Sequence, residues 1–307
     1  MSLTVPPPAI WEIPEPLSTD SVEVDDDAII VLRRHGNPAG PRLVLSHGNG
    51  LAIDLYYPFW SLLAADFDLV VHDLRNHGWN KVGALENHSF DAFPRDHDSI
   101  FETIESLYGE KPMVGVFHSI SALASLHLPS RGSHYSAMVL FTPPLCNTGP
   151  RYREFELLAR RTGDMLRRRA PWFRAREELA ELHTYLPHFQ RAVPGVFDLV
   201  ARTTLRESGT GRGYELRCPR EYEAQIWYEA SEPAVSVDFS SLRCPTKIIT
   251  SDPSLDPDRP KFDYGEATGV DHEFVPGTTH FLQLEKPEEC VAVMLDFLSR
   301  QGLVESS

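Results

Sequence analysis

The residue types that carry out nucleophilic acyl transfer occur in this chain in the order serine, acid, histidine. Ser119 lies in the segment Met113-Val-Gly-Val-Phe-His-Ser-Ile, where a β-rich run gives way to a helical one. A nucleophile at such a junction sits on a strained turn above the carboxyl end of its strand, and the dipole of the following helix favours its anion. A serine there can also serve only as a helix N-cap, so its position alone leaves both roles open.

The histidine and the acid that such a serine needs are both found near the end of the chain. His280 ends a Gly-Thr-Thr-His run in a predicted loop between the last strand and the last helix. Asp252 and Asp256 both follow the strand predicted at Lys247–Thr250, and each precedes a proline. We favour Asp252 as the acid that orients the His280 imidazole, with Asp256 as the alternative, because spacing does not decide which carboxylate reaches the ring. Either one can instead be an ordinary turn acid.

Two backbone amides are placed where an oxyanion would develop. The run Leu43-Val-Leu-Ser-His-Gly-Asn is a strand that leads into His47-Gly48, and the amide of Asn49 follows it. The second expected donor is the amide of Ile120, directly after the nucleophile. Preorganised amides of this kind contribute about 3–4 kcal/mol each to transition-state stabilisation.

The elements that must bring these segments together follow a repeating pattern of short strands and helices. Strands separated by helices of about a dozen residues imply right-handed crossovers and a mostly parallel α/β sheet. The predicted strands are 28–33, 43–46, 68–73, 113–117, 137–141, 247–250 and 273–275, and the predicted helices include 55–65, 98–108 and 120–128. The pattern stops in residues 145–240, which read as an inserted α-helical cap between core segments 1–144 and 241–307.

Four motifs in this order resemble those of the α/β-hydrolase superfamily. They are His47-Gly48, Asp73-Leu-Arg-Asn-His-Gly78, the turn at His118-Ser119, and the Gly-x-x-His run that ends at His280. The resemblance covers about residues 28–300 and implies the α/β-hydrolase fold with a helical cap. It also implies Ser119 as nucleophile, His280 as general base, and the amides of Asn49 and Ile120 as the oxyanion hole. Phe117 departs from the G-x-S-x-G pattern of this turn, which expects a glycine at that position.

The resulting prediction is a serine hydrolase without a metal or other cofactor, which cleaves a small-to-medium ester, thioester or lactone through an acyl-enzyme. Carbon–carbon bond hydrolysis by the same residues is one alternative. A second is a slow-turnover signalling receptor or regulator, because His118-Ser-Ile-Ser-Ala resembles the H-S-V-S-A of hormone-binding plant receptors and of a bacterial stress-response regulator. A third is a relative of the fold whose triad is inactive.

Composition limits the partners. A net charge of −15 argues against nucleic acid, and no apolar run approaches the length of a membrane span. The beginning of the chain is proline-rich and acidic, unlike a secretion signal, and the four cysteines form no paired motif. We therefore expect a cytoplasmic protein that binds a small molecule, as a monomer or a homodimer.

Several other residues have side chains that could carry out chemistry, but we expect them to have structural roles. His77 and His118 are expected to shape turns beside the site rather than to transfer protons. The cluster of His88, His97 and nearby acids has metal-ligand residue types but no recognised ligand spacing. Residues 151–176 hold nine arginines against three acids. We interpret them as a solvated helical face, with attraction of an anionic substrate or an acidic partner as the alternative.

Overall fold

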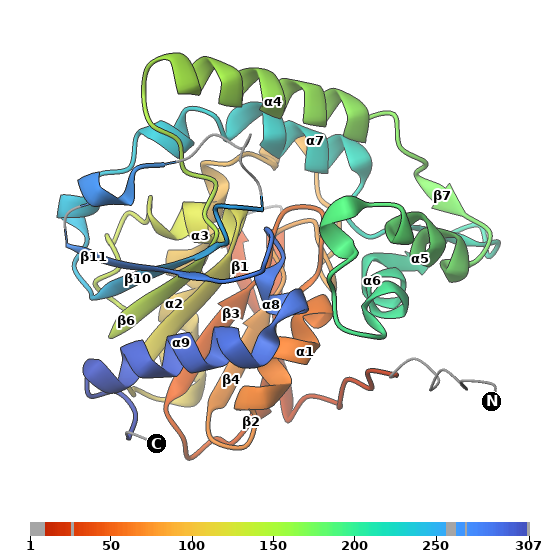
Figure 1. Cartoon of the computed structure of the whole chain (residues 1–307). Coiled ribbons are helices and arrows are strands. Elements are labelled where there is room, and N and C mark those ends of the chain that lie inside the picture. The colour runs from red at the N-terminus through yellow and green to blue at the C-terminus, as the bar shows by residue number, and fades with distance from the viewer. Residues whose placement is uncertain (1–9, 26–27, 256–261, 268, 306–307) are drawn as a thin grey trace, which may run out of the picture.

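The central element of the protein is an eight-stranded sheet with the order β1-β2-β4-β3-β5-β6-β10-β11. A computed structural model describes residues 10–25, 28–255, 262–267 and 269–305 (Figure 1). Strands β4, β3, β5, β6, β10 and β11 run parallel to one another. At one edge, β2 pairs antiparallel with both β4 and β1. The strands are β1 (Ser18–Asp25), β2 (Ala28–Gly36), β3 (Arg42–Ser46), β4 (Asp68–His72), β5 (Met113–His118), β6 (Ala137–Phe141), β10 (Thr246–Ser251) and β11 (Val270–Val275).

Both faces of the sheet are covered, which explains why its central strands are continuous apolar runs. Every residue of β3, β4, β5 and β6 is buried. Helices α2 (Ala92–Tyr108) and α3 (Ile120–Ser125) pack on one face, and α1 (Tyr57–Trp60) and α9 (Pro287–Arg300) pack on the other. Figure 1 shows these two layers on either side of the strands. The mostly parallel α/β architecture predicted from the sequence is confirmed.

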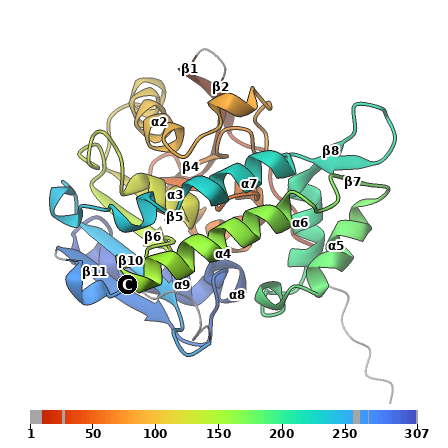
Figure 2. The same cartoon turned by 90° about the horizontal axis from the view of Figure 1, so that it is seen from above.

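The segment between β6 and β10 lies over the carboxyl ends of the strands. Helices α4 (Pro150–Leu166) and α7 (Arg220–Glu229) run side by side across this edge, as Figure 2 shows from above. Helices α5 (Arg176–Thr184) and α6 (Val196–Thr204) lie beside them. The segment also contains a small antiparallel sheet, formed by β7 (Trp172–Phe173), β9 (Tyr214–Leu216) and β8 (Leu205–Glu207). This sheet was not predicted, because strands of two or three residues carry too little periodicity to be recognised.

Two further expectations differ from the structure. The helix predicted at 55–65 is a succession of short turns, with η1 (Ile53–Tyr56), α1 and η2 (Ser61–Leu63) replacing one continuous helix. The helix predicted at 98–108 begins earlier, at Ala92, and therefore contains Asp96. Asp96 pairs there with Arg75. The division of the chain into core and cap at residues 144 and 241 stays a prediction.

Two further features concern the lengths of the described helices and the state of the cysteines. No helix in the described part of the chain is both long and apolar enough to cross a membrane. Cys146, Cys218, Cys244 and Cys290 are all free thiols and all buried.

Candidate active site

Ser119 occupies a strained turn between β5 and α3. Its backbone has φ 55° and ψ −116°, a conformation that L-residues rarely adopt. The amide of Ser119 donates to the Phe141 carbonyl at 2.9 Å, which ties the turn to the neighbouring strand β6. The Ser119 side chain makes no capping hydrogen bond to α3, a helix whose residues are all described. Ser119 is therefore partly exposed on a strained turn and does not act as a side-chain N-cap of α3.

The departure at Phe117 is accommodated inside the sheet. Its side chain is fully buried on the face covered by α2 and α3, where it stacks on His97 with ring centroids 4.8 Å apart. A side chain at Gly115 would place its Cβ only 2.6 Å from Phe117 Cε2, so Gly115 provides the space. Beyond the turn, the Ser121 hydroxyl bonds both the amide and the carbonyl of His118. The turn thus forms without the expected glycine at 117.

His280 reaches Ser119 from the loop after β11. Its Nε2 lies 3.0 Å from Ser119 Oγ, which is hydrogen-bond distance for proton transfer. The His280 carbonyl accepts hydrogen bonds from His118 Nε2 at 2.9 Å and from Thr142 Oγ1 at 3.2 Å. These contacts hold the backbone that carries the imidazole. The structure therefore brings together the two residues predicted as nucleophile and base.

A directional chain of hydrogen bonds connects this histidine loop to the turn after β3. Because the His280 carbonyl only accepts, His118 Nε2 carries the proton, and in the neutral ring Nδ1 is then the acceptor. The Tyr56 hydroxyl lies 2.7 Å from that Nδ1 and donates to it, and it accepts from the Gly48 amide at 3.3 Å. His118 and Tyr56 are both buried. This arrangement agrees with the positioning role predicted for His118.

The two residues whose amides are expected to form the oxyanion hole both lie at the cavity that contains Ser119. Ile120 opens α3, so its amide precedes the intrahelical ladder. Among the described residues, no acceptor is bonded to the backbone amide of either Asn49 or Ile120. Both amides are therefore available for a developing negative charge.

Gly48 allows the turn after β3 to approach the nucleophile. A Cβ at this position would lie 2.9 Å from His118 Nδ1 and 3.2 Å from Ser119 Cβ. We expect Gly48→Ala to displace the turn after β3, which carries the Asn49 amide and which we call the oxyanion turn. The variant should lower kcat for an ester by about 100-fold, because a catalytic group misplaced by about 1 Å costs this much. Gly209→Ala is the matched control, since its Cβ meets nothing within 4 Å. Equal kinetics for the two variants would contradict the close approach.

Two buried histidines hold the same turn as neutral groups. His47 accepts from the Leu74 amide and contacts the Gly48 carbonyl, and burial lowers the pKa of His47 to about 3. His77 accepts from the Gly50 amide, and burial lowers the pKa of His77 to about 4. Both rings are fully inaccessible to solvent. His77 thus has the structural position that the sequence predicts.

These histidines should make the protein acid-sensitive. Unfolding returns the pKa of each ring to about 6.5, so below that pH the unfolded state binds protons that the folded state excludes. The free energy of unfolding should therefore fall as the pH drops from 6.5 toward 4, by about 1 kcal/mol per histidine per pH unit. Urea denaturation at pH 7.5 and 5.5 measures this loss. His77→Asn should reduce the pH dependence, and equal stability of the unmodified chain at both values would refute the argument.

Asp252 braces the loop that carries His280. Its Oδ2 accepts from the Gly277 amide at 2.8 Å, and its Oδ1 accepts from the amide and hydroxyl of Ser254. Its own amide donates to the Thr278 carbonyl at 3.0 Å. The hydrogen bonds from Ser254 and Gly277 lower the pKa of Asp252 to about 2. Asp256 lies outside the described residues, so the choice of triad acid stays a prediction.

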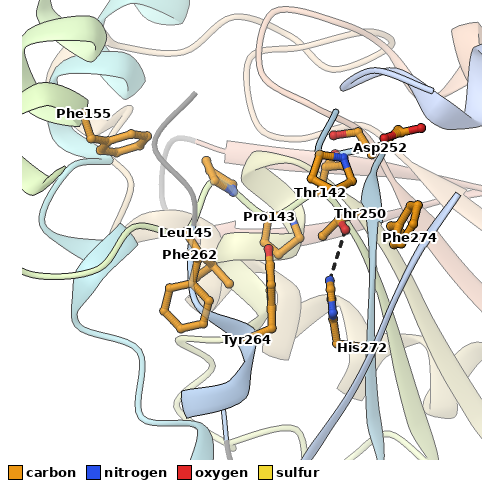
Figure 3. Close-up of a pocket in the computed structure, with 13 residues that line it drawn as sticks. Thr142, Pro143, Leu145, Phe155, Thr250, Asp252, Phe262, Tyr264, His272 and Phe274 are labelled. Atoms are coloured by element: carbon orange, nitrogen blue, oxygen red, sulfur yellow. Dashed lines mark hydrogen bonds between the residues drawn. The ribbon is translucent and has the colours of Figure 1, made fainter. Parts of the chain in front are cut away.

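The serine and histidine open into a cavity under α4 and α7. This space of about 520 Å³ is mostly apolar, and we call it the apolar lobe; Phe155, Leu158, Met165, Ile226 and Trp227 are among its walls. A smaller cavity of about 160 Å³ shares Pro144 and Phe155 with it and continues past Asp252 (Figure 3). In that pocket His272 stacks on Tyr264 and contacts Thr250 Oγ1 at 3.1 Å. The walls of both cavities are mainly apolar.

Comparison with known families now identifies the fold. The family model described as "Alpha/beta hydrolase family" matches residues 43–293, which include the strands of the sheet from β3 onward and every residue of the site. The chain belongs to the alpha/beta hydrolase family.

Individual relatives of this alpha/beta hydrolase are distant. Abhydrolase domain-containing protein ACTT2 of Alternaria alternata is 26% identical over 231 residues, covering 62% of this chain and 84% of the relative. Among solved structures, E-2-(acetamidomethylene)succinate hydrolase has a TM-score of 0.68 at 14% identity, covering 92% of this chain and 99% of that one. The thioesterase domain from the curacin biosynthetic pathway has a TM-score of 0.66 at 17% identity, with 91% and 98% covered. At this identity the structural likeness concerns the fold.

Several residues of the site in this alpha/beta hydrolase were not predicted from the sequence. Tyr56 bonds the His118 ring and Thr142 bonds the His280 carbonyl, and Arg169 and Glu223 line a second cavity beside Ser119. None of them belongs to a local motif, and only the fold brings them near the serine. Within the cluster of possible metal ligands, Asp98 accepts from Ser130 and His88 bonds Asn76, whereas His97 is buried and stacks on Phe117.

Proposed function

We propose that the protein is a serine hydrolase that cleaves a small-to-medium carboxylic ester, thioester or lactone through an acyl-enzyme on Ser119. The observation that carries this proposal is the 3.0 Å contact between His280 Nε2 and Ser119 Oγ on a strained turn. That contact faces a cavity with an apolar wall. A carbonyl compound with an apolar substituent suits such a site.

The reaction follows from the positions of these groups. As Ser119 Oγ bonds to the substrate carbonyl carbon, its proton passes to His280 Nε2, and the amides of Asn49 and Ile120 bind the oxyanion. Collapse of the tetrahedral intermediate breaks the bond to the alcohol or thiol, which takes the proton from His280. Water then attacks the acyl-enzyme with His280 as base, releases the acid and restores Ser119. An aspartate, Asp252 or Asp256, would orient the imidazolium.

The relatives support this class of chemistry without fixing the substrate. They include a thioesterase domain, and a thermophilic esterase from Thermogutta terrifontis with a TM-score of 0.63 at 17% identity, covering 92% of this chain and 99% of that one. The substrate would be a small molecule that enters the cavity. Four free, buried cysteines fit a reducing compartment, so we also propose a cytoplasmic location.

Trapping the acyl-enzyme tests the proposal. Aryl esters, thioesters and lactones of graded acyl length are mixed with the protein, quenched in acid, and digested for mass spectrometry. We expect the peptide containing Ser119 to gain the mass of the acyl group, with a burst of released alcohol or thiol. Turnover of β-diketones but not of esters would favour carbon–carbon bond hydrolysis. Sluggish turnover with ligand-dependent binding of a partner protein would favour the receptor alternative.

A further inference from the structure

A second cavity leads from Ser119 and His280 toward α5 and α6; its walls are mainly apolar, like those of the apolar lobe, but they also contain a buried ion pair. This space of about 240 Å³, which we call the polar lobe, is lined by Arg169 and Glu223 as well as by the catalytic pair. Asn49, Trp227 and Phe281 line both lobes. A substrate bound at Ser119 would therefore have different surroundings on its two sides.

Arg169 and Glu223 form an ion pair within this lobe. Arg169 Nη2 lies 2.6 Å from Glu223 Oε2. Glu223 is 7% exposed, and its burial raises the pKa of the carboxyl, an effect that the nearby Arg169 opposes. A Cβ at Gly50 would lie 2.3 Å from Glu223 Oε1, so the oxyanion turn packs directly against this carboxylate. The ion pair of Arg169 and Glu223 is thus part of the wall of the cavity that also contains Ser119 and His280.

Three buried polar atoms at this place have no hydrogen-bond partner within the described residues. They are Arg169 Nε, Glu223 Oε2 and Asn49 Oδ1. The Glu223 oxygen makes its ion pair without hydrogen-bond alignment. The orientation of Asn49 is fixed, because its Nδ2 donates to the Glu223 backbone carbonyl at 2.8 Å, and a carbonyl only accepts. Buried polar atoms are normally bonded, so such a cluster indicates a missing partner.

We propose that the polar lobe recognises an uncharged substrate group that both donates and accepts hydrogen bonds, such as a primary amide or a hydroxyl. Arg169 Nε is an unsatisfied donor and Asn49 Oδ1 an unsatisfied acceptor, and together they complement such a group. The inference rests on the proposed function and adds the substrate class. It also separates Arg169 from the arginines on the outer face of the cap, such as the exposed Arg168.

A carboxylate fits this lobe less well, because Glu223 balances the charge of Arg169. Besides His118 and His280 beside the serine, the titratable side chains that line it are His183 and His188, and burial lowers the pKa of these last two rings, which favours their neutral forms. A substrate carboxylate would therefore meet one cation and one anion with no net attraction. Removing the charge of Glu223 should reverse this preference.

Three ester substrates test the proposal. They are identical except for one terminal group, which is an isopropyl group, a primary amide or a carboxylate. One series carries the variable end on the acyl side and another on the alcohol side. We expect kcat/KM for the amide-ended ester to exceed that of the isopropyl ester by about tenfold or more in at least one series, because a site with unpaired polar groups rejects an apolar isostere. In Glu223→Gln the carboxylate-ended ester should gain about tenfold relative to the amide.

Arg169→Met should abolish the preference for the amide, whereas Arg168→Met, the exposed neighbour, should keep it. Labelling of Ser119 by a fluorophosphonate and a thermal melt are recorded for each variant, so that misfolding is recognised. Equal kcat/KM for the amide and isopropyl esters in both series of the labelled native protein would overturn the proposal. An equal loss on all three esters in folded Arg169→Met and Glu223→Gln would do so as well. Absence of labelling in the native protein would instead refute the proposed function.

Discussion

Ser119→Ala should lower kcat for an ester substrate by about 10⁶-fold while KM and the melting temperature change little. The variant removes the only atom that bonds to the carbonyl carbon in the proposed reaction. Loss of a serine nucleophile leaves only the catalysis that the oxyanion hole and substrate binding supply, which accounts for the expected size. Steady-state kinetics on an aryl ester, with protein freshly purified from a host that lacks comparable esterases, measures the loss.

The control for this variant is Ser61→Ala, which changes a partly buried serine in η2, away from the cavity that contains Ser119. It should retain native turnover. A Ser119→Ala protein with more than a few per cent of native kcat would show that another group attacks the substrate. Alanine at the strained φ of 55° is no worse than serine in backbone terms, so a gross loss of stability is not expected.

The second large effect distinguishes the two aspartates. Both oxygens of Asp252 are already bonded to Ser254 and to the Gly277 amide, and no described hydrogen bond joins this carboxylate to the His280 ring. We therefore expect Asp252→Asn to lower kcat only about tenfold, through the loop that it braces. Asp256→Asn should lower kcat by about 10⁴-fold, the cost of losing the acid that holds the imidazole tautomer.

Kinetics of the two variants side by side decide this point, with Ser254→Ala as a control. That substitution removes one hydrogen bond to Asp252 and leaves both charges in place. A 10⁴-fold loss in Asp252→Asn would assign the triad acid to Asp252, the residue favoured from the sequence. Small losses in both variants would show that neither Asp252 nor Asp256 is the triad acid.

The sheet could be predicted from the sequence where its strands are buried, and not where they are exposed. Strands β3, β5 and β6 are short apolar runs between turn residues, so their type and order were evident. Strand β1, Ser-Thr-Asp-Ser-Val-Glu-Val-Asp, lies at the sheet edge and is mostly polar, and it was missed. The helix predicted at 55–65 fails because its apolar residues fit several short turns as well as one helix.

The site was predictable to the extent that its residues belong to local motifs. Ser119 and His280 lie directly after strands whose carboxyl ends meet at one edge, so their meeting followed from a parallel sheet. Tyr56, Arg169 and Glu223 reach the site through tertiary packing of η1, the loop after α4, and α7. Nothing in their sequence neighbourhood separates them from ordinary core or surface residues. Arg169 is one of nine arginines in its stretch, and only burial distinguishes it from Arg168.

The central claim is that His280 activates Ser119, and the rate of fluorophosphonate labelling tests it most directly. Native protein should be labelled stoichiometrically, with the adduct mapped to the peptide that contains Ser119. His280→Ala should be labelled slower by a factor of about 10³ or more, because the serine proton then has no acceptor at 3.0 Å. Native protein that stays unlabelled, or that reacts no faster than His280→Ala, would contradict the account.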